Sequence, residues 1–335
     1  MKRLLPLILL TALPLSACGE KNEAITPSSK TTQHLTLLLD WFPNADHVGI
    51  YEAQAKGYFA QAGLDVHIQV PSNVAEPLQL VATGKADVAV SYEPELMLAR
   101  NRNLALVSIG ALVQQPLTSI ISIGKHPVRR AAELGGKTVG DAGISYQHAY
   151  LRTIEKFGRV APGKVKEINV GANLVPALVS GRVSAILGGY WNYEAVQLAQ
   201  LGKRPSVIRM NQVGVPSYDE LVLVTRTSLL EQRPEVLRRF VQAIARGYQS
   251  ARSNPTGAVA DLDRLNPGLD QKLQLASVKA TSAAFFPARA GEPWGWQDPK
   301  QWNAYGQWML AHHLISNPNA VIDASTNELL AGQGF

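Results

Sequence analysis

The chain is poor in cysteine and in long apolar runs. Cys18 is the only cysteine among the 335 residues, so no intramolecular disulfide can form and a metal site built on several cysteines is excluded. Beyond the N-terminal segment, no apolar stretch is long enough to cross a membrane as a helix. The rest of the chain shows neither an internal repeat nor a low-complexity block, which favours an ordinary globular fold of two lobes.

The sequence also lacks clusters of charged residues of either sign. The sequence holds 32 Lys and Arg against 26 Asp and Glu, a net charge of +6. Without Lys2 and Arg3 the balance is 30 against 26, a net +4. A nucleic-acid-binding surface would be a clustered basic stripe with interleaved aromatics. The bases here are dispersed along the sequence, so we expect no nucleic-acid partner.

The N-terminal segment has the layout of a secretory signal. Lys2 and Arg3 precede the short apolar run 4–15, and Leu15-Ser16-Ala17-Cys18 resembles a bacterial lipobox. This predicts a signal peptide over 1–17, lipidation of Cys18 and a polar, flexible tether over 18–33. The protein is then exported, periplasmic and anchored to a membrane. The alternative is an ordinary signal that leaves a free thiol.

From residue 34 on, apolar runs alternate with helical patterns, which is typical of an α/β fold. We expect strands at 35–39, 66–70, 87–90, 104–109, 117–123, 136–140, 165–170, 185–187 and 221–225. We expect helices at 47–62, 76–83, 93–100, 146–157, 172–180, 191–201, 234–252, 255–265, 269–284 and 299–311.

Two similar α/β units predict two lobes. The apolar strands near 117–123 and 221–226 would cross between them, so that 34–119 with 225–335 forms lobe 1 and 120–224 forms lobe 2. Ligands in open α/β sheets bind beyond the carboxyl ends of the strands, so a cleft between the lobes would collect such loops from both.

Five segments resemble the thiamine-pyrimidine binding proteins, namely 39–50 (LDWFPNADHVGI), 57–59 (GYF), 84–88 (GKADV), 188–194 (GGYWNYE) and 215–221 (VPSYDEL). The resemblance implies a type II periplasmic-binding-protein fold, with two α/β lobes, two crossing strands and a helical C-terminal part. It also implies a monomer without a cofactor that delivers its ligand to the permease and ATPase subunits of an ABC importer. ThiY-like members of the family bind formylaminopyrimidine for thiamine salvage, and hydroxymethylpyrimidine is the other candidate ligand.

The residues suit a flat, aromatic ligand rich in paired donors and acceptors. Trp41 and Tyr190 follow strands of opposite lobes and could stack on the two faces of a pyrimidine ring. Asp40 and Glu194 could accept hydrogen bonds from its amine or from a protonated ring nitrogen. Asn44, with both a donor and an acceptor, suits an amide or a ring nitrogen.

Five more residues complete the predicted site. They are His47, Tyr92, Gly143, Ser145 and Tyr218. The glycine-rich turn that holds Gly143 and Ser145 could present backbone N–H groups to a ligand oxygen.

Other roles stay open for several of these side chains. The two aromatics could be core residues, Asp40 a cap, Glu194 a helix-start residue and His47 a structural hydrogen bonder.

Three other functions compete with pyrimidine binding. The related yeast-type pyrimidine synthase holds pyridoxal phosphate on a lysine, but that position falls on Ser91 here and its donor histidine falls near Glu95. A serine cannot form the imine, and the synthase's cysteine-rich motif is missing, so we expect no enzyme. A binder of a sulfonate- or nitrate-like anion would not place carboxylates in its pocket. A scaffold without a ligand would not need the paired aromatic and acidic loops.

Overall fold

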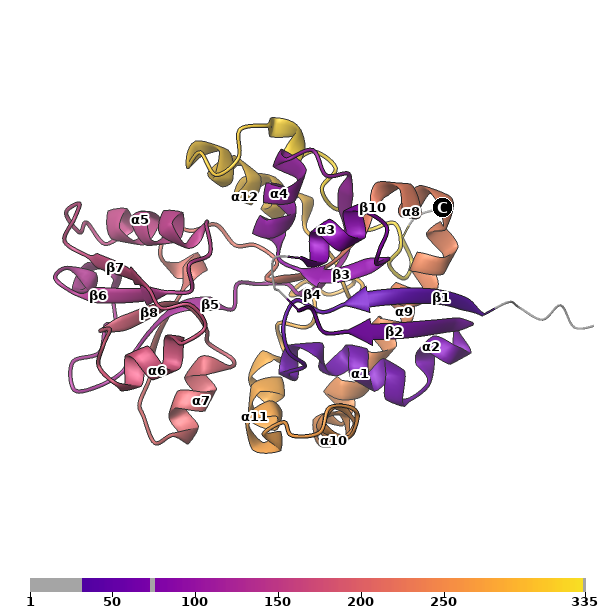
Figure 1. The fold of residues 1–335 in the computed structure, drawn as a ribbon, viewed down its shortest axis with the longest axis horizontal. Coiled ribbons are helices and arrows are strands. Elements are labelled where there is room, and N and C mark those ends of the chain that lie inside the picture. Colours follow the sequence, from indigo (N-terminus) through magenta and orange to yellow (C-terminus); the bar gives the residue numbers. More distant parts are fainter. Residues whose placement is uncertain (1–31, 73–75, 334–335) are drawn as a thin grey trace, which may run out of the picture. The chain divides into compact units, whose positions relative to one another are not determined.

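The computed structural model describes residues 32–72 and 76–333. The predicted signal peptide, Cys18 and the tether up to residue 31 lie outside the described residues. From Thr32 onward the chain forms one unit built on two five-stranded sheets, A and B (Figure 1).

Sheet A has the strand order β2-β1-β3-β10-β4. The first three strands are parallel, whereas β10 runs antiparallel to both of its neighbours, β3 and β4. The central strands β3 and β10 and the edge strand β4 are apolar runs buried on both faces, as expected for strands covered by helices on either side. The strands are β1 (Gln33–Leu38), β2 (Leu64–Gln69), β3 (Val88–Ser91), β4 (Leu106–Val113) and β10 (Leu221–Arg226).

Sheet B has the strand order β7-β6-β8-β5-β9. β6 is parallel to β7 and β8, and β5 is antiparallel to β8 and β9. The strands are β5 (Thr118–Ser122), β6 (Thr138–Asp141), β7 (Lys166–Asn169), β8 (Ala185–Tyr190) and β9 (Ser206–Arg209). We call 118–209 the sheet-B half, and the described residues outside it the sheet-A half.

Most helices belong to the sheet-A half (Figure 1). They are α1 (Val48–Ala55), α2 (Tyr58–Gln61), α3 (Pro77–Ala82), α4 (Glu93–Asn101), α8 (Thr227–Gln232), α9 (Pro234–Ser253), α10 (Pro255–Leu265), α11 (Gln271–Thr281) and α12 (Pro299–Ala311). The sheet-B half has α5 (Gln147–Phe157), α6 (Leu174–Val179) and α7 (Glu194–Gln200). Single 3-10 turns are η1 (Ala45–His47), η2 (Ala131–Leu134), η3 (Met210–Gln212) and η4 (Pro318–Ala320). Across the described residues, no helix combines the length and apolar character needed to span a bilayer.

The single helix predicted over 47–62 is divided in the structure. α1 ends before Gly57, whose φ of +67° is left-handed and therefore interrupts the helix. α2 follows, and Gly63, with φ +69°, ends it as predicted. The break turns the chain back toward β2.

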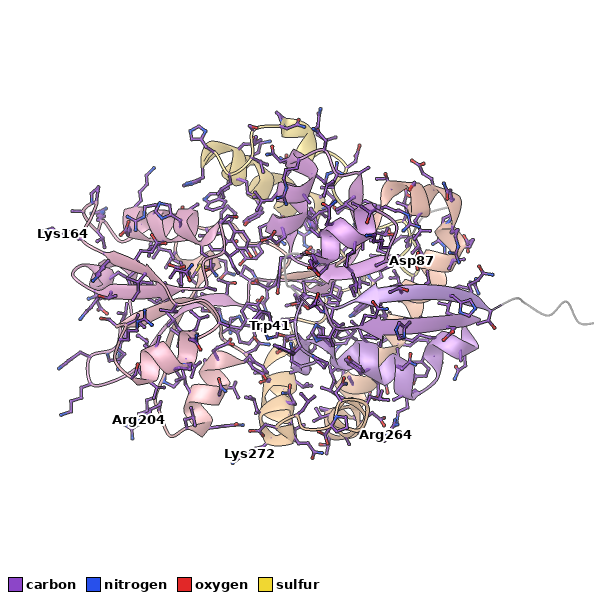
Figure 2. The ribbon with its side chains drawn as sticks, in the orientation of Figure 1. Trp41, Asp87, Lys164, Arg204, Arg264 and Lys272 are labelled. Carbon is purple, nitrogen blue, oxygen red and sulfur yellow. The ribbon has the colours of Figure 1, made fainter. Side chains whose placement is uncertain are left out.

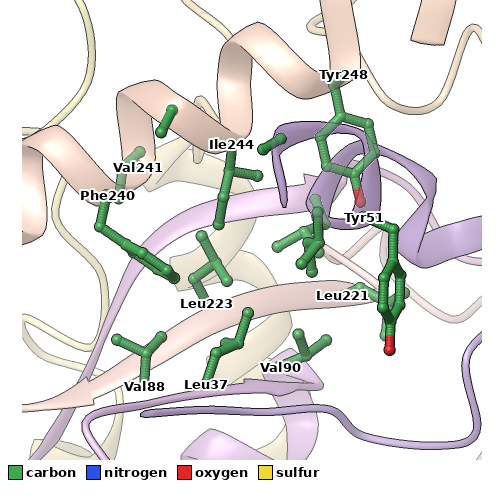
Figure 3. Close-up of a cluster of buried hydrophobic side chains, with 14 of the residues drawn as sticks. Leu37, Tyr51, Val88, Val90, Leu221, Leu223, Phe240, Val241, Ile244 and Tyr248 are labelled. Atoms are coloured by element: carbon green, nitrogen blue, oxygen red, sulfur yellow. The ribbon is translucent and has the colours of Figure 1, made fainter. Parts of the chain in front are cut away.

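The main core lies between sheet A and α9. Figure 3 shows Leu37 of β1, Val88 and Val90 of β3 and two β10 leucines facing one side of this helix. The residues that the helix contributes are Phe240, Val241, Ile244 and Tyr248. Because all of these side chains are buried, each contributes about 1.5–3 kcal/mol relative to leaving it exposed to water.

α1 packs against α9 at a pair of glycines. A Cβ atom placed on Gly247 would lie 2.0 Å from the carbonyl oxygen of Gly49, and one placed on Gly49 would lie 2.2 Å from the Tyr248 ring. The two helices therefore approach more closely than any larger residue would allow.

The chain passes between the sheets at 114–117 and 210–220. The strands expected as crossings are not themselves crossings, because β5 pairs wholly within sheet B and β10 wholly within sheet A. Glu220 joins the two passages. Its buried carboxylate accepts hydrogen bonds from the backbone N–H groups of Leu117 and Thr118, at 2.7 and 2.9 Å, and from the Thr118 hydroxyl at 3.0 Å.

Candidate functional site

Asp40 and Tyr92 meet at the carboxyl edge of sheet A. β1 and β3 are parallel neighbours, so the residues that follow them lie at the same edge. Tyr92 donates its hydroxyl to Asp40 Oδ2 at 2.7 Å, and the His47 ring nitrogen Nε2 lies 2.7 Å from Asp40 Oδ1. Both oxygens of this buried carboxylate are therefore engaged.

The surroundings keep Asp40 ionised. His47 Nδ1 accepts the Asn44 N–H at 3.3 Å, which leaves the proton on Nε2 to donate to Asp40. Burial alone would raise the pKa of Asp40, but the His47 ring and the hydrogen bonds from His47 and Tyr92 outweigh it and lower that pKa. His47 and Tyr92 thus hold the carboxylate in one orientation.

Asn44 shapes the loop that carries Trp41. Its Oδ1 accepts the Asp46 N–H at 2.8 Å and its Nδ2 donates to the Phe42 carbonyl at 2.9 Å. This is the arrangement of a helix N-cap, here at the start of η1. The structure therefore uses the Asn44 amide inside the loop.

Trp41 and Phe42 are exposed aromatics at the tip of that loop. Their side chains are 39% and 65% exposed, and the rings meet edge to face with centroids 5.7 Å apart. Figure 2 marks Trp41 in the region between the two sheets. Trp41 is therefore not a core residue, and its ring is available for stacking.

Tyr190 and Glu194 come from the sheet-B half. Tyr190 ends β8, and Glu194 begins α7 and accepts the Tyr190 N–H at 2.7 Å. Burial raises the pKa of Glu194, although this hydrogen bond works against the rise. Tyr190 packs against the same core cluster as Tyr92. Burial, followed by the charge of Glu220 and those of Tyr92 and Asp40, raises the pKa of Tyr190. The two halves therefore bring Asp40, Tyr92 and Tyr190 together.

A buried polar contact that the sequence did not predict joins the halves. Asn192, fully buried, donates from Nδ2 to Asp46 Oδ1 and to Thr281 Oγ1, each at 2.7 Å. Asn192 belongs to the sheet-B half, whereas Asp46 lies in η1 and Thr281 ends α11. Asp46 and Asn192 both lie inside the motifs quoted above, which was the only sequence signal for them.

The burial of Asp46 should make stability depend on pH. Burial raises the pKa of Asp46 to about 7, with His47 and the hydrogen bond from Asn192 opposing the rise and the charges of Asp40 and Glu194 adding to it. Because the pKa of Asp46 is higher in the folded chain than in the unfolded chain, the folded state is favoured most at a pH where the carboxyl group is protonated in both. That contribution is full below about pH 4 and is lost as the pH rises through about 7. Asp46→Asn should therefore lose about 2 kcal/mol less stability than the wild type between about pH 5 and pH 8.

Urea unfolding at the two pH values measures this difference. The exposed Glu231→Gln is the control, and it should follow the wild type. If the wild type and Asp46→Asn lost the same free energy of unfolding between the two pH values, the raised pKa of Asp46 would be contradicted.

The glycine-rich turn after β6 is internally bonded. Gly143, with φ +76°, donates its N–H to Asp141 Oδ1 at 2.7 Å, and the Ala142 N–H donates to Gln147 at 2.9 Å. Gly143 and Ser145 are exposed. Two of the N–H groups expected to face a ligand oxygen thus have partners within the turn.

Tyr218 lies in the passage 210–220 and is fully buried there. Its ring centroid is 5.9 Å from that of Tyr150 and 4.8 Å from that of Tyr305. The residue belongs to an aromatic cluster beside the passage and presents no surface to a ligand. As for metals, the described part of the chain contains no cluster of three or more His, Cys, Asp or Glu arranged to hold an ion.

Comparison with known proteins identifies the family. The profile of the family described as NMT1/THI5 like matches residues 44–258. A formylaminopyrimidine-binding protein of Halalkalibacterium halodurans is 33% identical over 95% of this chain and 96% of its own length. A 4-amino-5-hydroxymethyl-2-methylpyrimidine phosphate synthase of Saccharomyces cerevisiae is 24% identical over 90% of this chain and 89% of its own.

The solved structures identify the fold. The periplasmic aliphatic sulphonate-binding protein SsuA of Escherichia coli superposes with a TM-score of 0.68 at 14% identity, over 87% of this chain and 90% of its own. This confirms the predicted fold class, that of the type II periplasmic binding proteins. The profile match and the 33% identical relative show that this chain is a member of the NMT1/THI5-like family.

Proposed function

We propose that the protein is a solute-binding protein that captures a thiamine-related aminopyrimidine, formylaminopyrimidine or hydroxymethylpyrimidine. The observation that carries the proposal is the exposed Trp41 ring on the loop that follows buried Asp40, a carboxylate whose charge acts on Tyr190 of the other half. The relative named for formylaminopyrimidine binding supports it, because the similarity covers nearly the whole of both chains.

Each residue has a distinct part in this proposal. Trp41 and Tyr190 stack on the two faces of the ring. Asp40 and Glu194 accept hydrogen bonds from the amine, since a carboxylate oxygen already engaged once keeps a second lone pair. His47 and Tyr92 orient Asp40 and need not touch the ligand. Asn44, Gly143 and Tyr218 have weaker claims, because the structure gives them other contacts, and Ser145 is an exposed residue of the same turn as Gly143.

Capture would proceed by closure of the two halves about the passages 114–117 and 210–220. The closed form would then be recognised by the permease and ATPase subunits of an ABC importer. Lipidation of Cys18 after export would keep the protein at the membrane surface. These steps extend the proposal from binding to thiamine salvage.

The related synthase is the second candidate. Its similarity spans 90% of this chain, so a pyrimidine-forming enzyme is the alternative that the comparisons favour. The position matched to its imine-forming lysine is Ser91, which is buried at the end of β3 and cannot form an imine. We therefore prefer the binding protein.

Calorimetric titration with formylaminopyrimidine tests the site. Trp41→Ala and Glu194→Gln are each expected to weaken binding about tenfold or more, which is about 1.4 kcal/mol. Phe42→Ala is the matched control, because it removes the neighbouring exposed ring and should change affinity by less than about threefold.

Two outcomes would contradict the proposal. Unchanged affinity in both variants would remove the site assignment. A response to an alkanesulfonate without one to any pyrimidine would replace the ligand class. Folding is checked separately by unfolding curves, since none of the three substitutions should change them much.

A further inference from the structure

The two halves of the molecule carry opposite net charge. The sheet-B half, 118–209, contains 13 Lys and Arg but only 5 Asp and Glu, a net +8. The rest of the chain from residue 32 on contains 15 bases and 19 acids, a net −4. The modest excess in the whole sequence therefore conceals a strong asymmetry, of the kind that produces a field over one part of a surface.

The topology of sheet B gathers these bases at one edge. β6, β7 and β8 are parallel, with Thr138 opposite Lys166 and Val139 opposite Ala185, so all three strands begin at the same edge. β5 runs the other way and ends there at Ser122, opposite the start of β9. The candidate site lies at the other edge, where β8 ends in Tyr190.

We call this the basic edge, made of the segments 123–137, 156–166, 180–184 and 201–205. These segments carry 11 Lys and Arg and a single acid, Glu133. The bases are Lys125, Arg129, Arg130, Lys137, Lys156, Arg159, Lys164, Lys166, Arg182, Lys203 and Arg204. In Figure 2, Lys164 and Arg204 both lie at the end of the sheet-B half that points away from sheet A.

Little within the chain neutralises this charge. Glu133 pairs with Arg130, and it is the only carboxylate that forms an ion pair with the basic edge among residues 32–72 and 76–333. The acids that flank the edge are engaged with other bases, Glu155 with Arg152 and Glu167 with His148 and Arg152. Bases near the C-terminal ends of α5 and α7 also interact favourably with the dipoles of these helices. That explanation does not reach the segment 123–137, which connects β5 to β6.

The segment 123–137 also forms a recess. Its volume is about 540 Å³, and it is lined by Lys125, His126, Val128, Arg129, Lys137 and the carboxylate of Glu133, which pairs with Arg130. A flat lipid surface could not enter such a recess, whereas a protruding chain segment with carboxylate side chains could. The shape therefore favours a polypeptide over a membrane as the anionic partner.

We propose that the basic edge is the docking surface for an acidic segment of a partner protein, with its recess receiving one or more carboxylate side chains. The docked partner would sit at the edge of sheet B opposite Tyr190, so it could bind whether or not the candidate site is occupied. Complementary charges on two exposed surfaces raise the association rate and set orientation more than they add affinity.

Binding of a labelled oligoglutamate peptide to the full chain at low salt tests the proposal. The triple variant Lys125→Gln, Arg129→Gln and Lys137→Gln is expected to bind about tenfold more weakly. The control variant, Lys85→Gln, Lys272→Gln and Lys300→Gln, removes the same charge from exposed positions in the sheet-A half and should change binding by less than about threefold. Both variants should keep wild-type unfolding curves and wild-type pyrimidine titrations.

Three results would overturn the proposal. Equal weakening in the two variants would mean that only net charge matters. Absence of oligoglutamate binding by the wild type would remove the surface altogether. Binding to phosphatidylglycerol vesicles but not to oligoglutamate would assign the edge to a lipid surface.

Discussion

Gly247→Ala is expected to destabilise the protein by about 3 kcal/mol or more, because α1 and α9 cannot stay at their present separation. The new Cβ would lie 2.0 Å from the Gly49 carbonyl oxygen and 3.0 Å from Ala53, both on α1. Backbone cannot rotate away as a side chain could, so the helices must move apart and loosen the core around Tyr248. The gain in helix propensity from Gly to Ala, about 1 kcal/mol, opposes this loss but is smaller.

Urea unfolding of Gly247→Ala and of Gln242→Ala measures the effect. Gln242 lies on the exposed side of the same helix, so its variant should remain within about 0.5 kcal/mol of the wild type. If Gly247→Ala lost less than about 1 kcal/mol, the helices would be able to separate at little cost, and the glycine contact would not define their packing.

Glu220→Ala is expected to cost about 2–5 kcal/mol, because it leaves the buried donors of Leu117 and Thr118 without an acceptor. The Leu117 and Thr118 N–H groups cannot turn to another partner, since both are fixed by the start of β5. Burial raises the pKa of Glu220, and these same hydrogen bonds work against the rise. The donors therefore stabilise the ionised form of the buried carboxyl group.

Glu220→Gln separates the hydrogen bonds from the loss of side-chain volume. The glutamine carbonyl can accept both N–H groups, and the Thr118 hydroxyl can rotate to accept from the amide. We expect this variant to recover at least half of the stability that Glu220→Ala loses, as measured by denaturant unfolding. Equal losses in the two variants would show that the contact acts through packing alone.

Much of the fold could be predicted from the sequence because local signals were strong. Apolar runs such as 221–225 and long amphipathic patterns such as 234–252 correspond to β10 and α9 within a residue or so. The short β9 and α8 were missed, because four to six residues carry little periodic signal. The placement of the passages was wrong by a few residues, because apolar content indicates a strand but not the sheet that it joins.

The site was partly predictable for the same reason. Asp40 and Trp41 follow a clear strand, so their position at a sheet edge could be inferred. The bond between Asp46 and Asn192 joins residues far apart in sequence, and no spacing rule links them. The internal bonds of Gly143 also escaped prediction, because the N–H groups of its turn were expected to face a ligand oxygen and not the Asp141 side chain of the same turn.

The position of β10 constrains the order in which the chain can mature during synthesis. β10 lies between β3 and β4, and it is the only strand that pairs with β4 in the described part of sheet A. Residues 114–220 separate the two partners, whereas every strand of sheet B comes from the continuous stretch 118–209. Sheet B can therefore close as soon as its own residues emerge, while β4 waits with an unpaired edge. A chain interrupted before residue 221 would hold a complete sheet B beside an open sheet A, and would be a substrate for chaperones and proteases.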